Sequence, residues 1–266
     1  MADYSGVSDT LFIPLAGRIF ISKKFPEYFY DETALSLENE LPVKDIMERS
    51  SVYTMLSPCA RYYNFDKITK DFLKRKGPGV NVVNIGSGLE TARDRIPDAG
   101  ITYYEIDLPD VIKLREEVLP ARENQILIAA DAFEGSWTES VDASKPTLVI
   151  ASGIFQYFHK EKIIPLIKLI SEKIPGCELV FDATNTKGLK YCEKYVKKTG
   201  NTEAAMYFAV DNPEDFAEEC GMKLMRWCNF YEDARVILKK KADLYSRIAM
   251  KVCDKDGRAI ILHLQL

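Results

Sequence analysis

Five short apolar runs follow one another through the middle of this 266-residue sequence, and segments with helical character separate them. The runs span residues 80–85, 101–106, 125–130, 147–152 and 177–183. Strands that are apolar along their whole length, rather than at alternate positions, are typical of a parallel sheet covered by helices on both faces. The sequence therefore predicts an α/β fold with a mostly parallel sheet.

The chain before this series has a different pattern. Gly77-Pro78-Gly79 favours a turn, and the apolar residues that precede it recur at helical spacing without a convincing strand. We expect an N-terminal helical cap over residues 1–77 and a core domain over residues 78–266. Pro14 is expected to interrupt the first helical pattern, which covers residues 9–25.

The last part of the chain departs from the alternation of strands and helices. Residues 212–230 indicate a capped helix, a turn at Gly221 and a sixth strand, and residues 232–253 indicate one long helix. Residues 254–266 begin with a turn and end in a strand that we expect to be antiparallel. The predicted fold is thus a Rossmann-like α/β sheet, mostly parallel, with an antiparallel last strand.

Composition and charge narrow the classes of partner. The formal net charge of −4 gives no general attraction for nucleic acid, and we interpret the basic runs at 74–76 and 239–241 as solvated helix ends. Six cysteines without C-x-x-C spacing and only two histidines argue against a metal site and favour reduced thiols. Residues 1–10 do not resemble a signal peptide, and no apolar run approaches the roughly 18 residues that span a bilayer. We expect a cytoplasmic protein that binds a small molecule and neither nucleic acid nor membrane; its oligomeric state stays open.

The stretch NVVNIGSGLETARDRI, residues 81–96, places two glycines directly after the first strand. Gly86 and Gly88 let the backbone approach a ligand that a Cβ would exclude, and α/β proteins bind cofactors at the carboxyl ends of their strands. Three cofactor classes compete with a plain strand-to-helix turn. A P-loop needs a lysine that is missing from this turn, and a dinucleotide site prefers glycine at the position of Thr91. S-adenosylmethionine carries no phosphate and needs only the tight turn.

Acidic residues follow the second and third strands. Asp107 lies 19 residues after Gly88, where a carboxylate can bind both ribose hydroxyls of NAD or of S-adenosylmethionine. Asp131 follows the third strand, where a carboxylate can accept from an adenine amino group. Each aspartate taken alone can instead be a helix N-cap. The two together favour S-adenosylmethionine, and an NAD-dependent oxidoreductase is the alternative.

Four motifs occur in order along the chain: NVVNIGSGLETARDR, YEIDLPDVIKLREEVLP, IAADAFEGSW and TLVIASGIFQYF. Together with the leading segments AGRIFISKKFPEYFYDETA and SPCARYYNFDKITKDFL, they resemble the leucine carboxyl methyltransferase family, especially its bacterial branch of tetracenomycin-type polyketide O-methyltransferases. The resemblance runs from Leu11 to Asp182. It implies a class I methyltransferase fold with S-adenosyl-L-methionine as cofactor and S-adenosyl-L-homocysteine as product.

The resemblance also implies roles for individual residues. Gly86 and Gly88 match the turn beneath the methionine part of the cofactor, and Asp107 matches the ribose-binding acid. Asp131 and Ala132 match the pair that frames the adenine. Arg61 matches an arginine for the cofactor's carboxylate, and guanidinium groups suit carboxylates. The full implied cofactor-binding set is Arg18, Arg61, Gly86, Gly88, Asp107, Leu108, Asp131, Ala132 and Ser152.

Three positions depart from the family's pattern. Glu90 stands where an aspartate is common, and Ala92 replaces an arginine, although Arg95 keeps a later one. Ser152-Gly153 replaces a pair that usually begins with a glutamate, which helps to bind the amino-acid end of the cofactor. Because serine offers a hydrogen bond but no charge, weaker cofactor binding or another route of contact is expected. A non-catalytic, cofactor-binding member of the family is therefore a further alternative.

The acceptor is predicted to lie between the N-terminal helices and the carboxyl edge of the sheet. Its candidate walls are Tyr28, Phe29, Tyr30, Gln156 and Tyr157. A carboxylate nucleophile needs no base, whereas a hydroxyl needs one. His159 and His263 are interpreted as structural, and no catalytic residue is assigned. The sequence predicts an S-adenosylmethionine-dependent O-methyltransferase that acts on a carboxylate or hydroxyl of a small molecule, such as a polyketide-like metabolite.

Overall fold

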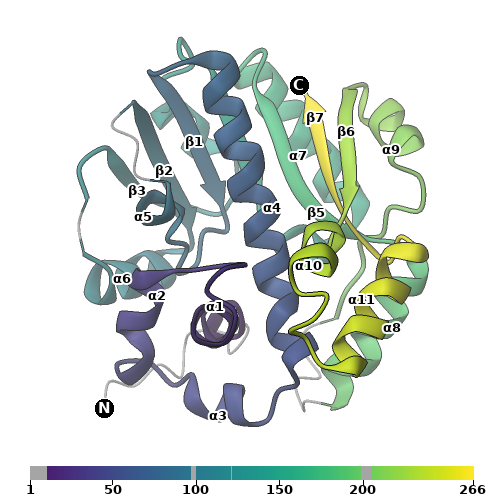
Figure 1. Ribbon diagram of the computed structural model, residues 1–266. Coiled ribbons are helices and arrows are strands. Elements are labelled where there is room, and N and C mark those ends of the chain that lie inside the picture. Colours follow the sequence, from purple (N-terminus) through teal and green to yellow (C-terminus); the bar gives the residue numbers. More distant parts are fainter. Residues whose placement is uncertain (1–10, 97–99, 121, 199–204) are drawn as a thin grey trace.

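The computed structural model describes residues 11–96, 100–120, 122–198 and 205–266, and its centre is a seven-stranded sheet (Figure 1). The strands are β1 (Val80–Ile85), β2 (Ile101–Asp107), β3 (Gln125–Ala129), β4 (Thr147–Ala151), β5 (Glu178–Thr184), β6 (Lys223–Asn229) and β7 (Ala259–Gln265). The helices are α1 (Phe12–Lys24), α2 (Glu32–Ser36), α3 (Lys44–Glu48), α4 (Val52–Lys76), α5 (Ala92–Arg95), α6 (Pro109–Val118), α7 (Lys160–Lys173), α8 (Thr186–Lys198), α9 (Pro213–Cys220), α10 (Glu232–Ile237) and α11 (Leu244–Lys255). None of these helices is both long and apolar enough to cross a bilayer. Residues 1–10, on which the signal-peptide prediction rests, lie outside the described residues.

The strands lie in the order β3-β2-β1-β4-β5-β7-β6. Strands β1 to β5 pair in parallel, whereas β7 is antiparallel to both of its neighbours, β5 and β6. The predicted mostly parallel sheet with an antiparallel last strand is therefore confirmed. The last strand does not form the edge of the sheet but enters between β5 and β6, which explains its mainly apolar sequence.

Helices cover both faces of the sheet, and the strand side chains alternate between two cores. Val80 and Val82 of β1 belong to the core that α1 and α4 share. Val83 and Ile85 belong to the opposite core, to which α7 and α9 contribute. Helix α4 crosses one face of the sheet and contacts β1 and β4 (Figure 1). The N-terminal helices thus pack directly against the strands whose carboxyl ends carry the glycine turn and Ser152.

The predicted break at Pro14 is wrong. Helix α1 begins at Phe12 and includes Pro14 in its first turn. A proline is tolerated there because the first amide groups of a helix have no acceptor within the helix. The helix therefore starts at this point of the sequence instead of being interrupted.

The single long helix predicted over residues 232–253 is also wrong. Helix α10 ends at Ile237, and α11 begins at Leu244 after Asp243, whose Oδ1 accepts a hydrogen bond of 2.9 Å from the amide of Ser246. This contact is an N-cap, and the Asp-x-x-Ser spacing that forms it is visible in the sequence. Two helices with a turn between them allow the chain to fold back before β7.

Candidate functional site

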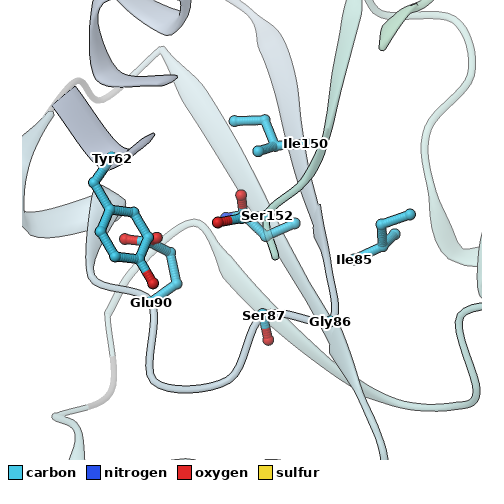
Figure 2. A pocket seen from close by; sticks show the side chains of 8 residues that line it. Tyr62, Ile85, Gly86, Ser87, Glu90, Ile150 and Ser152 are labelled. Atoms are coloured by element: carbon cyan, nitrogen blue, oxygen red, sulfur yellow. The ribbon is translucent and has the colours of Figure 1, made fainter. Parts of the chain in front are cut away.

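The carboxyl ends of β1 and β4 and the loop after β1 enclose a pocket (Figure 2). Its lining residues are Tyr62, Asn84, Ile85, Gly86, Ser87, Glu90, Ile150 and Ser152. The cavity among them has a volume of about 20 Å³, which is far less than the roughly 300–1,000 Å³ of a complete small-molecule site. The pocket is thus suited to one end of a larger ligand, with the remainder lying along the open edge of the sheet.

The glycine turn forms one wall of this pocket. Gly86 and Gly88 have φ angles of +64° and +51°, a region of backbone conformation that favours glycine. A Cβ atom on Gly86 would lie 2.6 Å from Cδ1 of Ile154. Both the backbone conformation and the close approach therefore require glycine at this position.

Asp107, at the end of β2, lies directly against the turn. Its Oδ2 accepts a hydrogen bond of 2.7 Å from the amide of Gly88, and its Oδ1 accepts one of 2.8 Å from the amide of Leu108. Burial raises the pKa of Asp107, and the two amide hydrogen bonds oppose this rise. Leu108 is 53% exposed and is the N-cap residue that precedes α6. The structure thus places a carboxylate and an exposed apolar side chain beside the glycine turn.

Asp131 and Ala132 follow β3, which is the neighbour of β2 in the sheet. The amide of Ala130 donates to the carbonyl of Asp107 at 2.9 Å, which holds the two strand ends side by side. Asp131 is exposed, and its Oδ1 accepts from the amide of Phe133 at 2.8 Å. Ala132 is buried, and its carbonyl accepts from the indole of Trp137. The acidic residues after β2 and β3 therefore lie at the same edge of the sheet.

Arg61 of α4 lies beside the end of β4, with 11% of its side chain exposed. Its Nη1 lies 3.3 Å from Oδ2 of Asp182 in β5, and Oδ1 of the same aspartate accepts a hydrogen bond of 2.6 Å from the amide of Gly153. A Cβ atom on Gly153 would lie 2.4 Å from Nη1 of Arg61, so the arginine packs onto bare backbone. Nε of Arg61 is buried and has no hydrogen-bond partner among the described residues. Asp182 was not predicted as part of the site, although its place at the end of a strand was a usable signal.

Arg18 of α1 lies behind the glycine turn, in a buried ion-pair cluster that we define as Arg18, Asp31, Asp66, Glu90 and Arg95. Arg18 is 1% exposed; it donates to Asp31 at 2.9 Å and to the carbonyl of Leu89 at 2.6 Å. Arg95 contacts the carboxylates of Asp31, Asp66 and Glu90 at 2.8–3.1 Å. Arg18 does not line the pocket, and its contacts instead fix the loop that follows the glycines.

Arg115 of α6 holds the same loop from the other side. Its Nη1 donates to the carbonyl of Gly88 at 2.8 Å, and its Nη2 donates to the carbonyl of Glu90 at 2.6 Å. Nη2 also lies 3.4 Å from Glu105 of β2, which is fully buried. The loop from Gly88 to Glu90 is thus held by two buried arginines from different helices, neither of which the sequence marks as a partner of the turn.

Glu105 gives this region a predicted pH dependence. Burial raises the pKa of Glu105 to about 7, and Arg115 only partly opposes this shift. Because the folded-state pKa lies above the ordinary value of 4.5, the folded protein retains a proton that the unfolded chain has released. Glu105 therefore makes the protein less stable as pH rises. Between about pH 4.5 and 7, the free energy of unfolding falls by up to roughly 3 kcal/mol because of this one group.

The substitution Glu105→Gln is expected to remove this slope because the amide stays neutral. Urea unfolding at pH 5 and pH 7.5 measures the effect, and the stability of the variant relative to the wild type should increase with pH. Equal changes in both proteins between the two pH values would show that Glu105 does not titrate in this window.

The candidate acceptor walls lie in different surroundings. Tyr28 is 4% exposed and stacks on Tyr63 with 4.8 Å between the ring centroids, whereas Tyr30 is 54% exposed. Gln156 and Tyr157 belong to a short 3-10 turn after β4, and the carbonyl of Gln156 accepts from the amide of Tyr207. None of these four side chains lines the pocket of Figure 2, but Gln156 and Tyr157 follow its wall residue Ser152 closely in the chain.

The two histidines lie apart from the pocket lining. His159 stacks on Tyr207 with 4.0 Å between the ring centroids. His263 of β7 is buried, and its Nε2 lies 2.8 Å from Glu178. Glu178 is the first residue of β5, so this contact is at the amino ends of the parallel strands, opposite the carboxyl ends that carry the pocket. The contacts of His263 are therefore those of a core residue.

Several pocket residues were missed by sequence reasoning. Ser87 stands between the two glycines, and Tyr62 follows Arg61, so both had a local signal. Asn84 and Ile150 lie within apolar runs that predict buried strand, and only the three-dimensional structure shows that they reach the pocket.

Comparison with known proteins shows to which family the chain belongs. The sequence profile of the leucine carboxyl methyltransferase family matches residues 11–171. The tetracenomycin polyketide synthesis O-methyltransferase TcmP of Streptomyces glaucescens is 25% identical over 211 residues, which cover 79% of this chain and 77% of TcmP. An S-adenosyl-L-methionine-dependent methyltransferase family protein of Parafrankia is 30% identical over 139 residues, covering 48% of this chain and 44% of that protein.

Solved structures agree with the fold. A DUF574 family protein from Streptomyces avermitilis superposes with a TM-score of 0.60 at 13% identity and covers 94% of this chain and 96% of its own. Magnesium protoporphyrin IX methyltransferase from Synechocystis, solved with bound S-adenosylhomocysteine, has a TM-score of 0.52 at 13% identity and covers 82% of this chain and 88% of its own. The sheet order, the glycine turn and the family match together lead to one conclusion: the chain belongs to the leucine carboxyl methyltransferase family and is an S-adenosylmethionine-dependent methyltransferase.

Proposed function

We propose that this protein transfers a methyl group to an oxygen atom, in a carboxylate or hydroxyl, of a small molecule. The observation that carries the proposal is the pocket between the glycine turn and β4, with Asp107 beside it. The oxygen acceptor is supported by the similarity to TcmP, whose name describes an O-methyltransferase of polyketide synthesis.

Polar groups in the pocket fit the amino-acid end of the cofactor. The hydroxyl oxygens of Ser87 and Ser152 are buried and have no hydrogen-bond partner within the described ranges. A buried polar atom without a partner costs about 1–3 kcal/mol. A ligand with several donors and acceptors would therefore relieve this cost, which fits a methionyl group better than a purely apolar one.

The remaining cofactor contacts are proposed from position. Asp107 would receive the ribose hydroxyls, and the exposed side chain of Leu108 would cover one face of the adenine. Asp131 and Ala132 would frame the adenine edge, since their strand end lies next to that of Asp107. Arg61 would bind the carboxylate of the cofactor through Nε, which has no partner among the described residues.

The chain contributes mainly alignment to the reaction. When bound, S-adenosylmethionine supplies a methyl carbon that its positive sulfur has already activated. Holding the acceptor oxygen in line with that carbon can lower the activation free energy of methyl transfer by about 7–11 kcal/mol. A carboxylate acceptor is ionised at neutral pH and needs no base, so that Gln156 and Tyr157 would serve to orient the acceptor rather than to move a proton.

Methyl transfer from cofactor labelled with tritium in its methyl group tests the proposal. The acceptors are a panel of aromatic carboxylic acids, phenols, amines and thiols. We expect product with oxygen acceptors, and alkali then separates methyl esters, which release volatile labelled methanol, from methyl ethers, which do not. Transfer to nitrogen or sulfur alone would contradict O-methylation, and tight binding of S-adenosylhomocysteine without any transfer would indicate a non-catalytic member.

A further inference from the structure

The pocket contains one ionisable carboxylate, that of Glu90. Of its lining residues in the described part of the chain, the others are apolar or carry neutral amide or hydroxyl groups. Glu90 is 6% exposed, and Figure 2 shows it on the same pocket as Ser152 and beside Tyr62. A buried carboxylate in a ligand pocket needs a positive partner, because a charge removed from water without one is strongly destabilising.

The described contacts of Glu90 within the protein occupy one of its two carboxylate oxygens. Its Oε1 accepts a hydrogen bond of 2.7 Å from the amide of Thr91 and lies 2.8 Å from Nη1 of Arg95. Burial opposes its ionisation, but Arg95 and Arg18 outweigh burial and lower the pKa of Glu90. Both contacts fall on Oε1, and Oε2 accepts no hydrogen bond from the residues that the structure describes, which leaves it for a ligand.

The ion-pair cluster around Glu90 contains more negative than positive charge. Two guanidinium groups, those of Arg18 and Arg95, face the three carboxylates of Asp31, Asp66 and Glu90. Glu90 is the member of this cluster that lines the pocket, so its carboxylate is the negative charge that a ligand in the pocket would meet. A positively charged group of a ligand at this wall would pair with the carboxylate of Glu90.

A second observation points to a ligand at the same wall. Ser87, which is 8% exposed, lines the pocket together with Glu90, and its Oγ has no partner among the described residues. Arg61, the candidate partner of the ligand's carboxylate, also lies near this wall, with its guanidinium carbon 5.5 Å from the ring centroid of Tyr62.

We propose that Glu90 binds the α-ammonium group of S-adenosylmethionine through Oε2, beside the hydroxyl groups of Ser87 and Ser152. This assignment rests on the proposed cofactor site and adds a charged contact to it. It also explains how a chain with the uncharged Ser152 directly after β4 neutralises the ammonium group: the carboxylate comes from the loop after β1 instead of the end of β4.

The test compares two ligands on one variant. S-adenosylhomocysteine carries the amino-acid group, and 5′-methylthioadenosine is the same nucleoside thioether without it. In titration calorimetry, Glu90→Gln is expected to weaken the binding of S-adenosylhomocysteine roughly 10- to 100-fold, because one charged hydrogen bond is lost. The Kd of 5′-methylthioadenosine should change less than twofold. Glu116→Gln, at an exposed position of α6, removes the same charge from the surface and should leave both affinities unchanged.

Equal weakening of both ligands would show that Glu90 only supports the loop, and an unchanged affinity for S-adenosylhomocysteine would show that it does not contact the ammonium group. Either result overturns the assignment while leaving the cofactor site in place. If the wild-type protein bound neither ligand, the cofactor site itself would be wrong, so the two failures are distinguishable. A Glu90→Asp variant, which keeps the charge, is expected to retain more affinity for S-adenosylhomocysteine than Glu90→Gln.

Discussion

Replacing Asp107 with alanine is expected to weaken the binding of S-adenosylhomocysteine at least 100-fold. The amides of Gly88 and Leu108 hold the Asp107 carboxylate at the carboxyl edge of β2, where it can accept from both hydroxyls of a ribose. Two hydrogen bonds to a charged group contribute about 3–6 kcal/mol together, which corresponds to roughly 100-fold to 10⁴-fold in Kd. Titration calorimetry measures the loss directly, and the thermal stabilisation by the ligand should disappear with it.

Two further variants separate loss of contact from loss of structure. Asp110→Ala removes a carboxylate from the first turn of α6 at an exposed position, and its affinity should equal that of the wild type. Asp107→Asn keeps an oxygen that can accept from Gly88 and should lose less affinity than Asp107→Ala. If a folded Asp107→Ala protein bound S-adenosylhomocysteine within threefold of the wild type, the ribose would not lie at Asp107.

The substitution Arg95→Ala is expected to lower the free energy of unfolding by about 3–5 kcal/mol, because removing one partner leaves buried charges uncompensated. The side chain of Arg95 is 6% exposed and makes contacts with Asp31, Asp66 and Glu90. Without it, Asp66 loses both of its hydrogen bonds from a guanidinium, at 2.8 and 2.9 Å. Urea unfolding followed by circular dichroism measures the change, with an unaltered slope against urea showing that the unfolded state is the same.

Arg93→Ala is the matched control for Arg95→Ala. Arg93 belongs to the same helix, α5, and donates to the carbonyl of Glu123 at the surface, so its loss should change stability by less than about 0.5 kcal/mol. The loss in Arg95→Ala should also shrink as pH falls. The carboxylates left without a partner then have raised folded-state pKa values, and protonation relieves them. A destabilisation below 1 kcal/mol at pH 7 would mean that the cluster does not depend on Arg95.

The sheet could be predicted from the sequence because the signals that indicate its strands are local. Runs such as Val80–Ile85 are mainly apolar and buried along their whole length, and glycine occupies both positions where the turn has positive φ. Sequence reasoning also placed Asp107 and Asp131 at one edge, since parallel strands end at the same side of a sheet. The contacts of Arg18 and Arg115 with the loop after β1 were beyond its reach, because they join residues 25 or more positions apart through the packing of helices.

Local signals also left the source of charge in the pocket open. Ser152 drew attention as an uncharged residue at the end of β4, and nothing in the local sequence indicates that Glu90 lines the same pocket. The helix predicted over residues 232–253 failed for a different reason, because periodic apolar residues outweighed the cap signal of Asp243. Long-range packing and short capping motifs are thus the two kinds of information that periodicity does not contain.

A crystal structure of the protein with S-adenosylhomocysteine would show where the cofactor binds. We expect density for the ligand along the carboxyl edge of β1, β2 and β4, with the ribose on Asp107 and the amino-acid group in the pocket formed by Ser87, Glu90 and Ser152. Density at another place on the molecule, with this pocket filled by ordered water alone, would contradict this expectation.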